Sequence, residues 1–228
     1  MESTHCQQEI ELLKILKELQ PVLTTALNSL GIEKRLTQES RYLGWAAKSV
    51  DFATDSYILL RDAGRVHGSK FLIRPILETV IAAGAVTNVK GMLFQKYYTE
   101  ITKANKKFSK DAAHQAKAKK ELEELKRIFL LEDPAYPIKC EELQISKMAK
   151  AAKLPDVFYD VGYSTYCEFT HGSLRAVNGK LNDATDPIDT STVISCVLIV
   201  LSLLQKHTPA IVPDLAPFEK RQITYSMV

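Results

Sequence analysis

The stretch FLIRPILETVIAAGAV, residues 71–86, is the part of the chain that says most about its fold. It is apolar on nearly every side, which is typical of a helix buried at the centre of a bundle. Arg74 and Glu78 are its charged residues, and Pro75 between them removes a backbone hydrogen bond and should bend the helix. The small residues at 82–85 would let a neighbouring helix approach closely. We therefore predict a buried central helix over residues 69–89.

Regular spacing of apolar residues predicts further helices on both sides of this one. The most apolar run, residues 193–204, is shorter than the roughly 20 residues that span a bilayer, so we interpret it as a buried core helix. The chain has no period-two strand pattern and no internal repeat. The fold class is therefore all-α, a bundle of about six to eight helices with a buried apolar central helix. The expected helices are 5–30, 33–65, 69–89, 92–132 with a break at Ser109, 141–153, a tyrosine-rich segment after Pro155, and 189–207.

Proline positions suggest how the chain is divided. Pro21 should kink or divide the first helix, and three prolines in the last twenty residues predict an extended tail. The expected division is an N-terminal helix at 1–32, a helical bundle domain at 33–208, and an extended C-terminal tail at 209–228.

Composition excludes several classes of protein. The 228 residues are 46% hydrophobic and 25% charged, which suits a globular domain with a sizeable core. A net charge of +3 is too small to imply nucleic-acid binding by itself. The four cysteines lie far apart and there is no CxxC pair or signal peptide. We expect free thiols, a cytoplasmic location and no association with a membrane.

Polar and titratable residues gather in YDVGYSTYCEFTHGSL, residues 159–174. Tyr159, Tyr163 and Tyr166 are three or four apart, so on a helix they share one face. His171 lies four residues after Cys167, and at a helix C-terminus its protonated form is favoured. A histidine in such a place is often purely structural.

A pocket that joined this segment to the central helix would have catalytic chemistry. Arg74, Glu78, Tyr163 and His171 together would supply a cation, a carboxylate and an acid–base group. The alternative is that Arg74 and Glu78, four apart on one helix, form an ion pair that only fixes helix packing.

Metal binding is poorly supported. Glu168 and His171 have the Glu-x-x-His spacing of di-iron bundles, but the nearest second copy, Asp111 and His114, lies in a lysine-rich stretch. Cys167 and His171 lack a second pair that would complete a zinc site. We expect no metal and no cofactor.

A basic stretch is the other candidate site. Residues 96–127 contain ten Lys or Arg and five Asp or Glu. Lys106, Lys107, Lys119 and Lys120 could follow a phosphate backbone, although such a run is often only the solvated face of a helix.

Two motifs suggest a family. Arg74-Pro-Ile-Leu-Glu78, followed by Tyr163-x-x-Tyr-Cys-x-Phe-Thr-His171, resembles a family of uncharacterised bacterial all-α proteins over about residues 40–205. Cys167 stands where that family usually has serine, and Ser164 where it often has arginine. The helical layout is also similar to the HEPN superfamily, many members of which are metal-independent ribonucleases that act as homodimers.

The HEPN resemblance implies an arginine and a histidine separated by four to six residues, and Arg61 and His67 satisfy that spacing. It further implies a homodimer that cleaves RNA in phage defence or as a toxin. In that reading His171 activates the 2′-hydroxyl, Arg74 or Arg61 holds the phosphate, and Glu78 orients the arginine. The alternative function is a non-catalytic interaction or nucleic-acid-binding module.

Overall fold

The computed structural model describes residues 2–30, 37–107, 111–155, 158–163, 165–167, 187–206 and 212–226. Every regular element in these residues is helical, so the all-α prediction is confirmed. The elements are α1 (Glu2–Leu30), α2 (Gln38–Asp62), α3 (Val66–Asn88), α4 (Met92–Lys107), α5 (Ala112–Glu132), α6 (Ile145–Ala152), the π-helix η1 (Phe158–Tyr163), α9 (Pro187–Gln205) and α10 (Ala216–Ser226).

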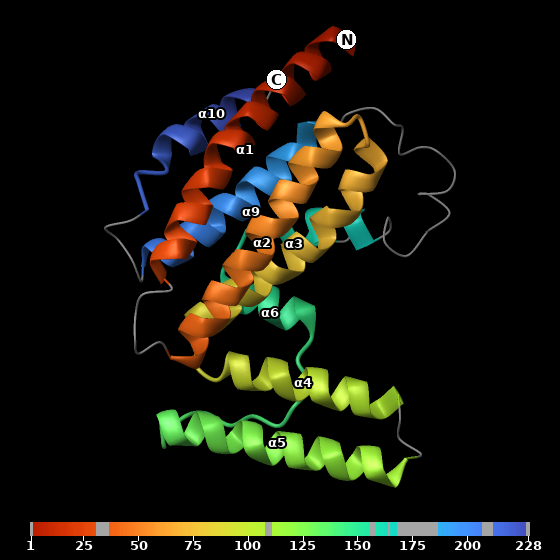
Figure 1. The fold of residues 1–228 in the computed structure, drawn as a ribbon, viewed down its shortest axis with the longest axis vertical. Helices are drawn as coiled ribbons and strands as arrows, with labels where there is room; N and C mark the ends of the chain where they lie inside the picture. Colours follow the sequence, from red (N-terminus) through yellow and green to blue (C-terminus); the bar gives the residue numbers. More distant parts are fainter. Residues whose placement is uncertain are drawn as a thin grey trace.

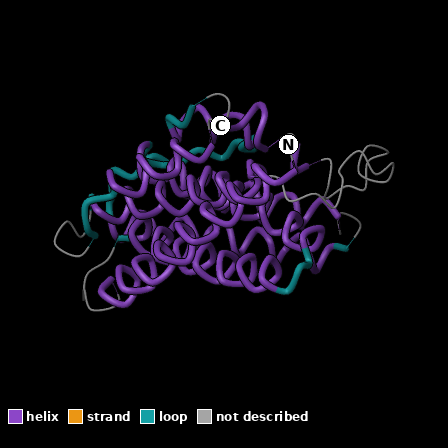
Figure 2. Tube along the Cα trace, turned by 90° about the horizontal axis from the view of Figure 1, so that it is seen from above, coloured by secondary structure: helices purple, strands orange, loops and turns teal. Residues whose placement is uncertain are grey.

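Four long helices form the body of the molecule. α3 packs against both α2 and α9, and α1 also packs on both α2 and α9 (Figure 1). α4 and α5 pair with each other at one end of this bundle, while α6 packs on α3 and α10 packs on α1. Figure 2 shows the same helices from above, with the long helices side by side.

The core is built on α3 and α9, as the sequence predicts for the two most apolar stretches. Both helices are also long and apolar enough to cross a membrane by length and composition, but more than half of each apolar window is buried inside the bundle. A core helix passes the same test, so this is weak evidence for a membrane span. Burying a leucine or isoleucine side chain contributes about 1.5–3 kcal/mol, so these two helices supply much of the folding energy.

Small residues on α3 allow the expected close approach, and the neighbour is α6. A Cβ atom added at Gly84 would lie 3.0 Å from the Cβ of Ala152. The Asn88 side chain then donates to the carbonyl oxygen of Ala152 at 2.8 Å, which caps α6 where Lys153 turns into the left-handed region. This contact places the C-terminal end of α6 beside the C-terminal part of α3.

Two expected boundaries are corrected. Pro21 does not divide the first helix, because α1 runs through it from Glu2 to Leu30. Ser109 lies outside the described residues, and the cap of α5 is Asp111, whose Oδ1 accepts from the backbone N–H groups of Ala113 and His114.

The extended C-terminal tail is wrong for residues 216–226, which form α10. Pro217 does not prevent this helix, because the second helical residue has no intrahelical acceptor for an N–H group. The guanidinium of Arg221 pairs with Glu18 on α1, and the amide of Gln222 donates to the hydroxyl of Ser195 at 2.7 Å. These contacts attach α10 to α1 and α9.

The tight contact at Gly84 predicts an asymmetry between two glycines. Gly84→Leu should lower the free energy of unfolding by about 1–3 kcal/mol, because the new side chain collides with α6. Gly44→Leu should raise it by about 0.5–1 kcal/mol, because no atom lies within 4 Å of a Cβ there and leucine favours a helix. Urea unfolding of both variants checks this, and equal effects would contradict the α3–α6 packing.

Candidate functional site

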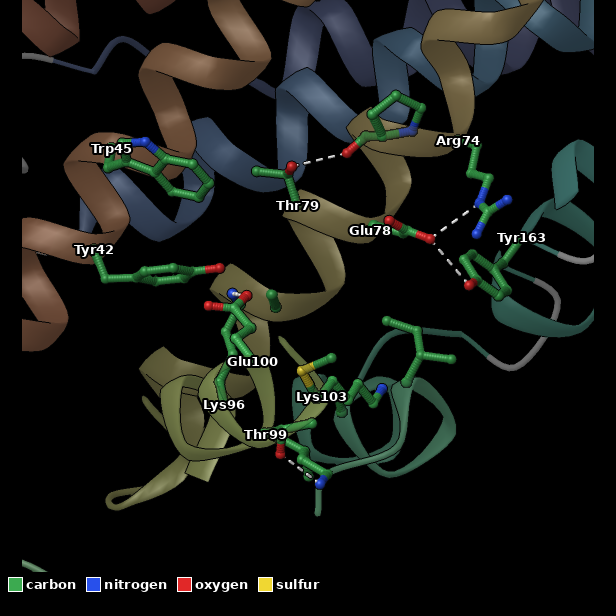
Figure 3. Close-up of a pocket in the computed structure, with 15 residues that line it drawn as sticks. Tyr42, Trp45, Arg74, Glu78, Thr79, Lys96, Thr99, Glu100, Lys103 and Tyr163 are labelled. Atoms are coloured by element: carbon green, nitrogen blue, oxygen red, sulfur yellow. Dashed lines mark hydrogen bonds and ion pairs between the residues drawn. The ribbon is translucent and has the colours of Figure 1, made fainter. Parts of the chain in front are cut away.

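A cleft of about 500 Å³ opens between α2, α3, α4, α6 and η1. Figure 3 shows the side chains that line it. Its walls combine apolar and aromatic side chains with a few charged groups, which is a common composition of a ligand-binding site. The lining residues that the following paragraphs use are Tyr42, Trp45, Arg74, Glu78, Lys96, Thr99, Glu100, Lys103 and Tyr163.

One end of the cleft holds Arg74, Glu78 and Tyr163, which are three of the four residues that the sequence analysis placed in one pocket and which we call the triad. Arg74 Nε donates to Glu78 Oε1 at 3.0 Å, and the Tyr163 hydroxyl donates to the same oxygen at 3.0 Å (Figure 3). The Arg74 guanidinium carbon lies 5.9 Å from the centre of the Tyr163 ring. The carboxylate therefore joins two segments that are 85 residues apart in the chain.

The triad is open to ligands, and two of its members, Arg74 and Tyr163, have raised pKa values. The Arg74 side chain is 17% exposed and the Glu78 side chain 40% exposed. Burial lowers the pKa of Arg74, but the hydrogen bond and charge of Glu78 outweigh it and raise that pKa overall. Burial, together with the neighbouring Cys167 and Glu78, raises the pKa of Tyr163 well above its ordinary value. Near neutral pH the phenol is therefore a hydrogen-bond donor and not a phenolate.

The other end of the cleft combines cations with aromatic rings. Lys96 pairs with Glu100, and its ammonium lies 5.3 Å from the centre of the Tyr42 ring. Tyr42 in turn lies beside Trp45, with 5.5 Å between ring centres. Lys103 is exposed on the rim. With the triad, these residues give the lining three cations and two carboxylates, a small excess of positive charge.

The tyrosine-rich segment is not one uniform face. Tyr159 stacks on Tyr163 with 5.3 Å between ring centres, but the hydroxyl of Tyr166 donates elsewhere, to Asp189 Oδ1 at 2.7 Å. The reason is that residues 158–163 are π-helical, which changes the angular spacing on which the expectation rests. His171 lies outside the described residues.

A second polar cluster is buried inside the bundle. Asp189 Oδ2 receives Arg61 Nη2 at 2.9 Å and lies 3.4 Å from the Lys70 ammonium. Arg61 Nη1 is 3.6 Å from Glu9, and the hydroxyl of Thr190 donates to Glu9 at 2.6 Å. We call Glu9, Arg61, Lys70 and Asp189 the buried quartet. Its side chains are between 2% and 7% exposed, and its two cations match its two acids.

The quartet and the cleft share two segments of chain. Lys70 belongs to the quartet and Arg74, one turn later on α3, belongs to the cleft. Tyr166 binds Asp189 while Tyr163, three residues earlier, binds Glu78. Burial raises the pKa of Tyr166 well above its ordinary value, so this hydroxyl also remains a donor. The contacts of Lys70 and Tyr166 with Asp189 therefore anchor the two segments that carry Arg74 and Tyr163.

Comparison with protein-family models decides the family. A model described as a family of unknown function, DUF5677, matches residues 41–188, well over half of the chain. The chain belongs to DUF5677. No curated protein and no solved structure matches it. Membership of an uncharacterised family, expected over residues 40–205, is thereby confirmed, and none of the comparisons links the chain to HEPN proteins.

The DUF5677 match covers every described lining residue of the cleft that the preceding paragraphs use. It also covers the two cations of the quartet but ends just before Asp189 and begins after Glu9. The two acids of the quartet therefore come from α1 and α9, outside the matched DUF5677 range.

The pair Arg61 and His67 is not brought to the cleft. The Arg61 guanidinium is 2% exposed inside the quartet, and its Nε donates to the hydroxyl of Tyr57 at 2.9 Å. His67 is exposed, and its ring packs edge-on against Phe71. The sequence spacing alone could not separate a buried arginine from an accessible one. The acids Glu9 and Asp189 were not recognised, because each lies more than fifty residues from Arg61 in the chain.

The four basic candidates lie on the α4–α5 pair. Lys106, Lys107, Lys119 and Lys120 are all exposed, and Lys106 pairs with Glu142. Within the described part of the chain, no group of three His, Cys, Asp or Glu residues is placed to hold a metal ion.

The quartet predicts that Asp189 is far more important to stability than a surface carboxylate. Asp189→Asn should lower the free energy of unfolding by about 3–5 kcal/mol, because two buried cations lose their counter-charge. Glu124→Gln, which breaks the exposed pair with Arg127, should leave the midpoint of unfolding unchanged. Thermal and urea unfolding compare the two. A small effect of Asp189→Asn would contradict the role of this carboxylate as the counter-charge of Arg61 and Lys70.

Proposed function

We propose that the cleft binds single-stranded RNA and cleaves it without a metal ion. The observation that carries the proposal is the triad, since Arg74, Glu78 and Tyr163 come from distant segments and meet in an accessible cleft. An ion pair that served packing alone would not need an open cleft beside it. Positive charge for a phosphate and aromatic rings for an unstacked base are both present, which is the usual combination for single strands.

The proposed reaction is attack of a ribose 2′-oxygen on the neighbouring phosphorus. A base removes the proton of the 2′-hydroxyl, a cyclic phosphate forms, and the bond to the 5′ oxygen breaks while water protonates that oxygen. His171 is the proposed base and Arg74 stabilises the phosphate charge. Glu78 holds the arginine, and Tyr163 holds Glu78 by donating to the same oxygen.

The resemblance to HEPN ribonucleases extends the proposal to a cytoplasmic homodimer that acts in phage defence or as a toxin. The competing function is a non-catalytic module that binds RNA or an acidic partner through α4 and α5. The exposed lysines of that pair favour it, although part of their charge is neutralised, as in the pair of Lys106 with Glu142.

Cleavage of a labelled single-stranded RNA tests the proposal. His171→Ala should reduce the rate about 10²–10⁴-fold and Arg74→Ala about 10²–10³-fold, because each removes one proposed transition-state interaction. Tyr163→Phe should cost about tenfold and leave the pH profile unchanged, since the raised pKa keeps the phenol protonated throughout the neutral range. Arg221→Ala, an arginine on α10, is the matched control and should have no effect.

The binding step has its own readout. Trp45 is the single tryptophan of the chain and lines the cleft, so its fluorescence should change when RNA binds. If RNA alters the fluorescence but is not cleaved, the cleft remains a binding site for RNA and the proposed ribonuclease activity is rejected. Neither cleavage nor a fluorescence change by the wild-type protein would reject the proposal.

The module has a separate test. Replacing Lys106, Lys107, Lys119 and Lys120 by glutamine should weaken RNA binding and flatten its salt dependence if those lysines contact phosphates. If the cleft is the site, this variant should keep its affinity while Arg74→Ala loses it. Electrophoretic mobility shifts at several salt concentrations compare the two variants.

A further inference from the structure

The outward face of α2 carries a regular stripe of exposed residues. Counting along the helix, the exposed positions are separated alternately by four and three residues. The stripe, which we call the α2 seam, consists of Arg41, Trp45, Lys48, Phe52, Asp55, Leu59 and Asp62. By the helical rise of 1.5 Å per residue it is about 32 Å long. A 4–3 alternation is the spacing at which one helix packs lengthwise on another.

Three large apolar side chains occupy every second position of the seam. Trp45 is 56% exposed, Phe52 75% and Leu59 61%, and they are seven residues apart. Single exposed apolar residues are common on protein surfaces, but three in register along one helix are the pattern of an interface. The other sides of α2 already pack on α1, α3 and α9, so the seam is the side left for a partner.

The charged positions of the seam are ordered by sign. Arg41 and Lys48 lie in its first half, and Asp55 and Asp62 lie in its second half. Within the described residues Lys48 and Asp55 form no ion pair, while Asp62 receives Lys17 at 2.8 Å and is still 45% exposed. The seam is therefore positive at one end and negative at the other.

We propose that the α2 seam is the interface of a homodimer in which two α2 helices pack antiparallel about a two-fold axis near Phe52. Trp45 and Leu59 are each seven residues from Phe52, so the axis places each opposite the other on the second copy. The same axis places Lys48 near the partner's Asp55 and Arg41 near the partner's Asp62. A parallel pair would instead place like charges together, which is unfavourable.

The residues that flank the seam fit a close approach. Ser49 and Ser56 lie beside the apolar side chains, and their hydroxyls already donate to the backbone oxygens of Trp45 and Phe52 at 3.1 and 3.0 Å. These small side chains would bring no unsatisfied polar group into the interface. An isologous contact of this kind closes after two copies, as a dimer does.

A homodimer is already part of the proposed function, but the interface on the α2 seam is inferred from the seam alone and would hold without any catalysis. The interface also affects the same cleft. Trp45 belongs to both the seam and the cleft lining. The second copy would therefore lie at the rim of the cleft. The part of its α2 that carries Leu59 would lie near Trp45 and Tyr42 of the first copy.

Sedimentation equilibrium of the full chain tests the interface. The wild type should be dimeric at micromolar concentration, and Phe52→Glu should raise the dimer dissociation constant at least a hundredfold, because two carboxylates would meet at the axis. Leu131→Glu is the matched control, since Leu131 is 70% exposed on α5, and it should leave the dimer intact. A monomeric wild type, or a Phe52→Glu variant that remains dimeric, would overturn the proposal.

Charge reversal tests the antiparallel arrangement and uses surface positions that should not disturb folding. Lys48→Asp and Asp55→Lys should each weaken self-association, because each places like charges opposite one another. When the two variants are mixed, position 48 of each chain faces an opposite charge at position 55 of the other chain. A heterodimer should therefore form. Failure of the mixture to associate more tightly than either variant alone would refute the antiparallel pairing.

Discussion

The carboxylate of Asp189 is the constraint on which the described structure depends. It stands in the first turn of the most apolar helix and receives groups from two other helices and from the tyrosine-rich segment. A charge at that depth is tolerated only when it is paired and hydrogen-bonded. Because its partners lie on different helices, satisfying one side chain fixes the relative positions of α2, α3 and α9. Glu9 and Thr190 extend the same arrangement to α1.

The buried contacts of Asp189 also determine the positions of the side chains that line the cleft. Lys70 and Arg74 are on successive turns of α3, and Tyr163 and Tyr166 are three residues apart. In each pair one residue is anchored in the interior and the other reaches the cleft. The hydrogen bonds at Glu78 are thus held from two directions, and the cleft needs no contribution from the α4–α5 pair to keep its triad together. A change in the interior would be transmitted to the cleft through these two short segments.

The sequence predicted the fold class and the pairing of Arg74 with Glu78 because both follow from local rules. An arginine and a glutamate four apart on an apolar helix favour pairing with each other. Tyr163 was expected in the same pocket together with His171, and that histidine lies outside the described residues. α10 was missed because proline was interpreted as a helix breaker, although proline is tolerated in a first turn. The quartet was missed because its members are brought together by tertiary packing, which leaves no spacing to detect. One signal existed: Asp189 is a carboxylate at the start of the most apolar helix, and a carboxylate that such a helix carries into the interior needs buried partners.

The balance of charge in the quartet also limits which substitutions the chain can accept during evolution. Losing one member leaves an uncompensated ion in the interior, whereas exchanging an opposite pair for apolar side chains of similar volume is tolerated. Substitutions at Arg61 should therefore be inherited together with substitutions at Glu9 or Asp189. Those acids lie on α1 and α9, outside the residues that the DUF5677 model matches. Co-variation of Arg61 with them would show that α1 and α9 evolve together with the matched region.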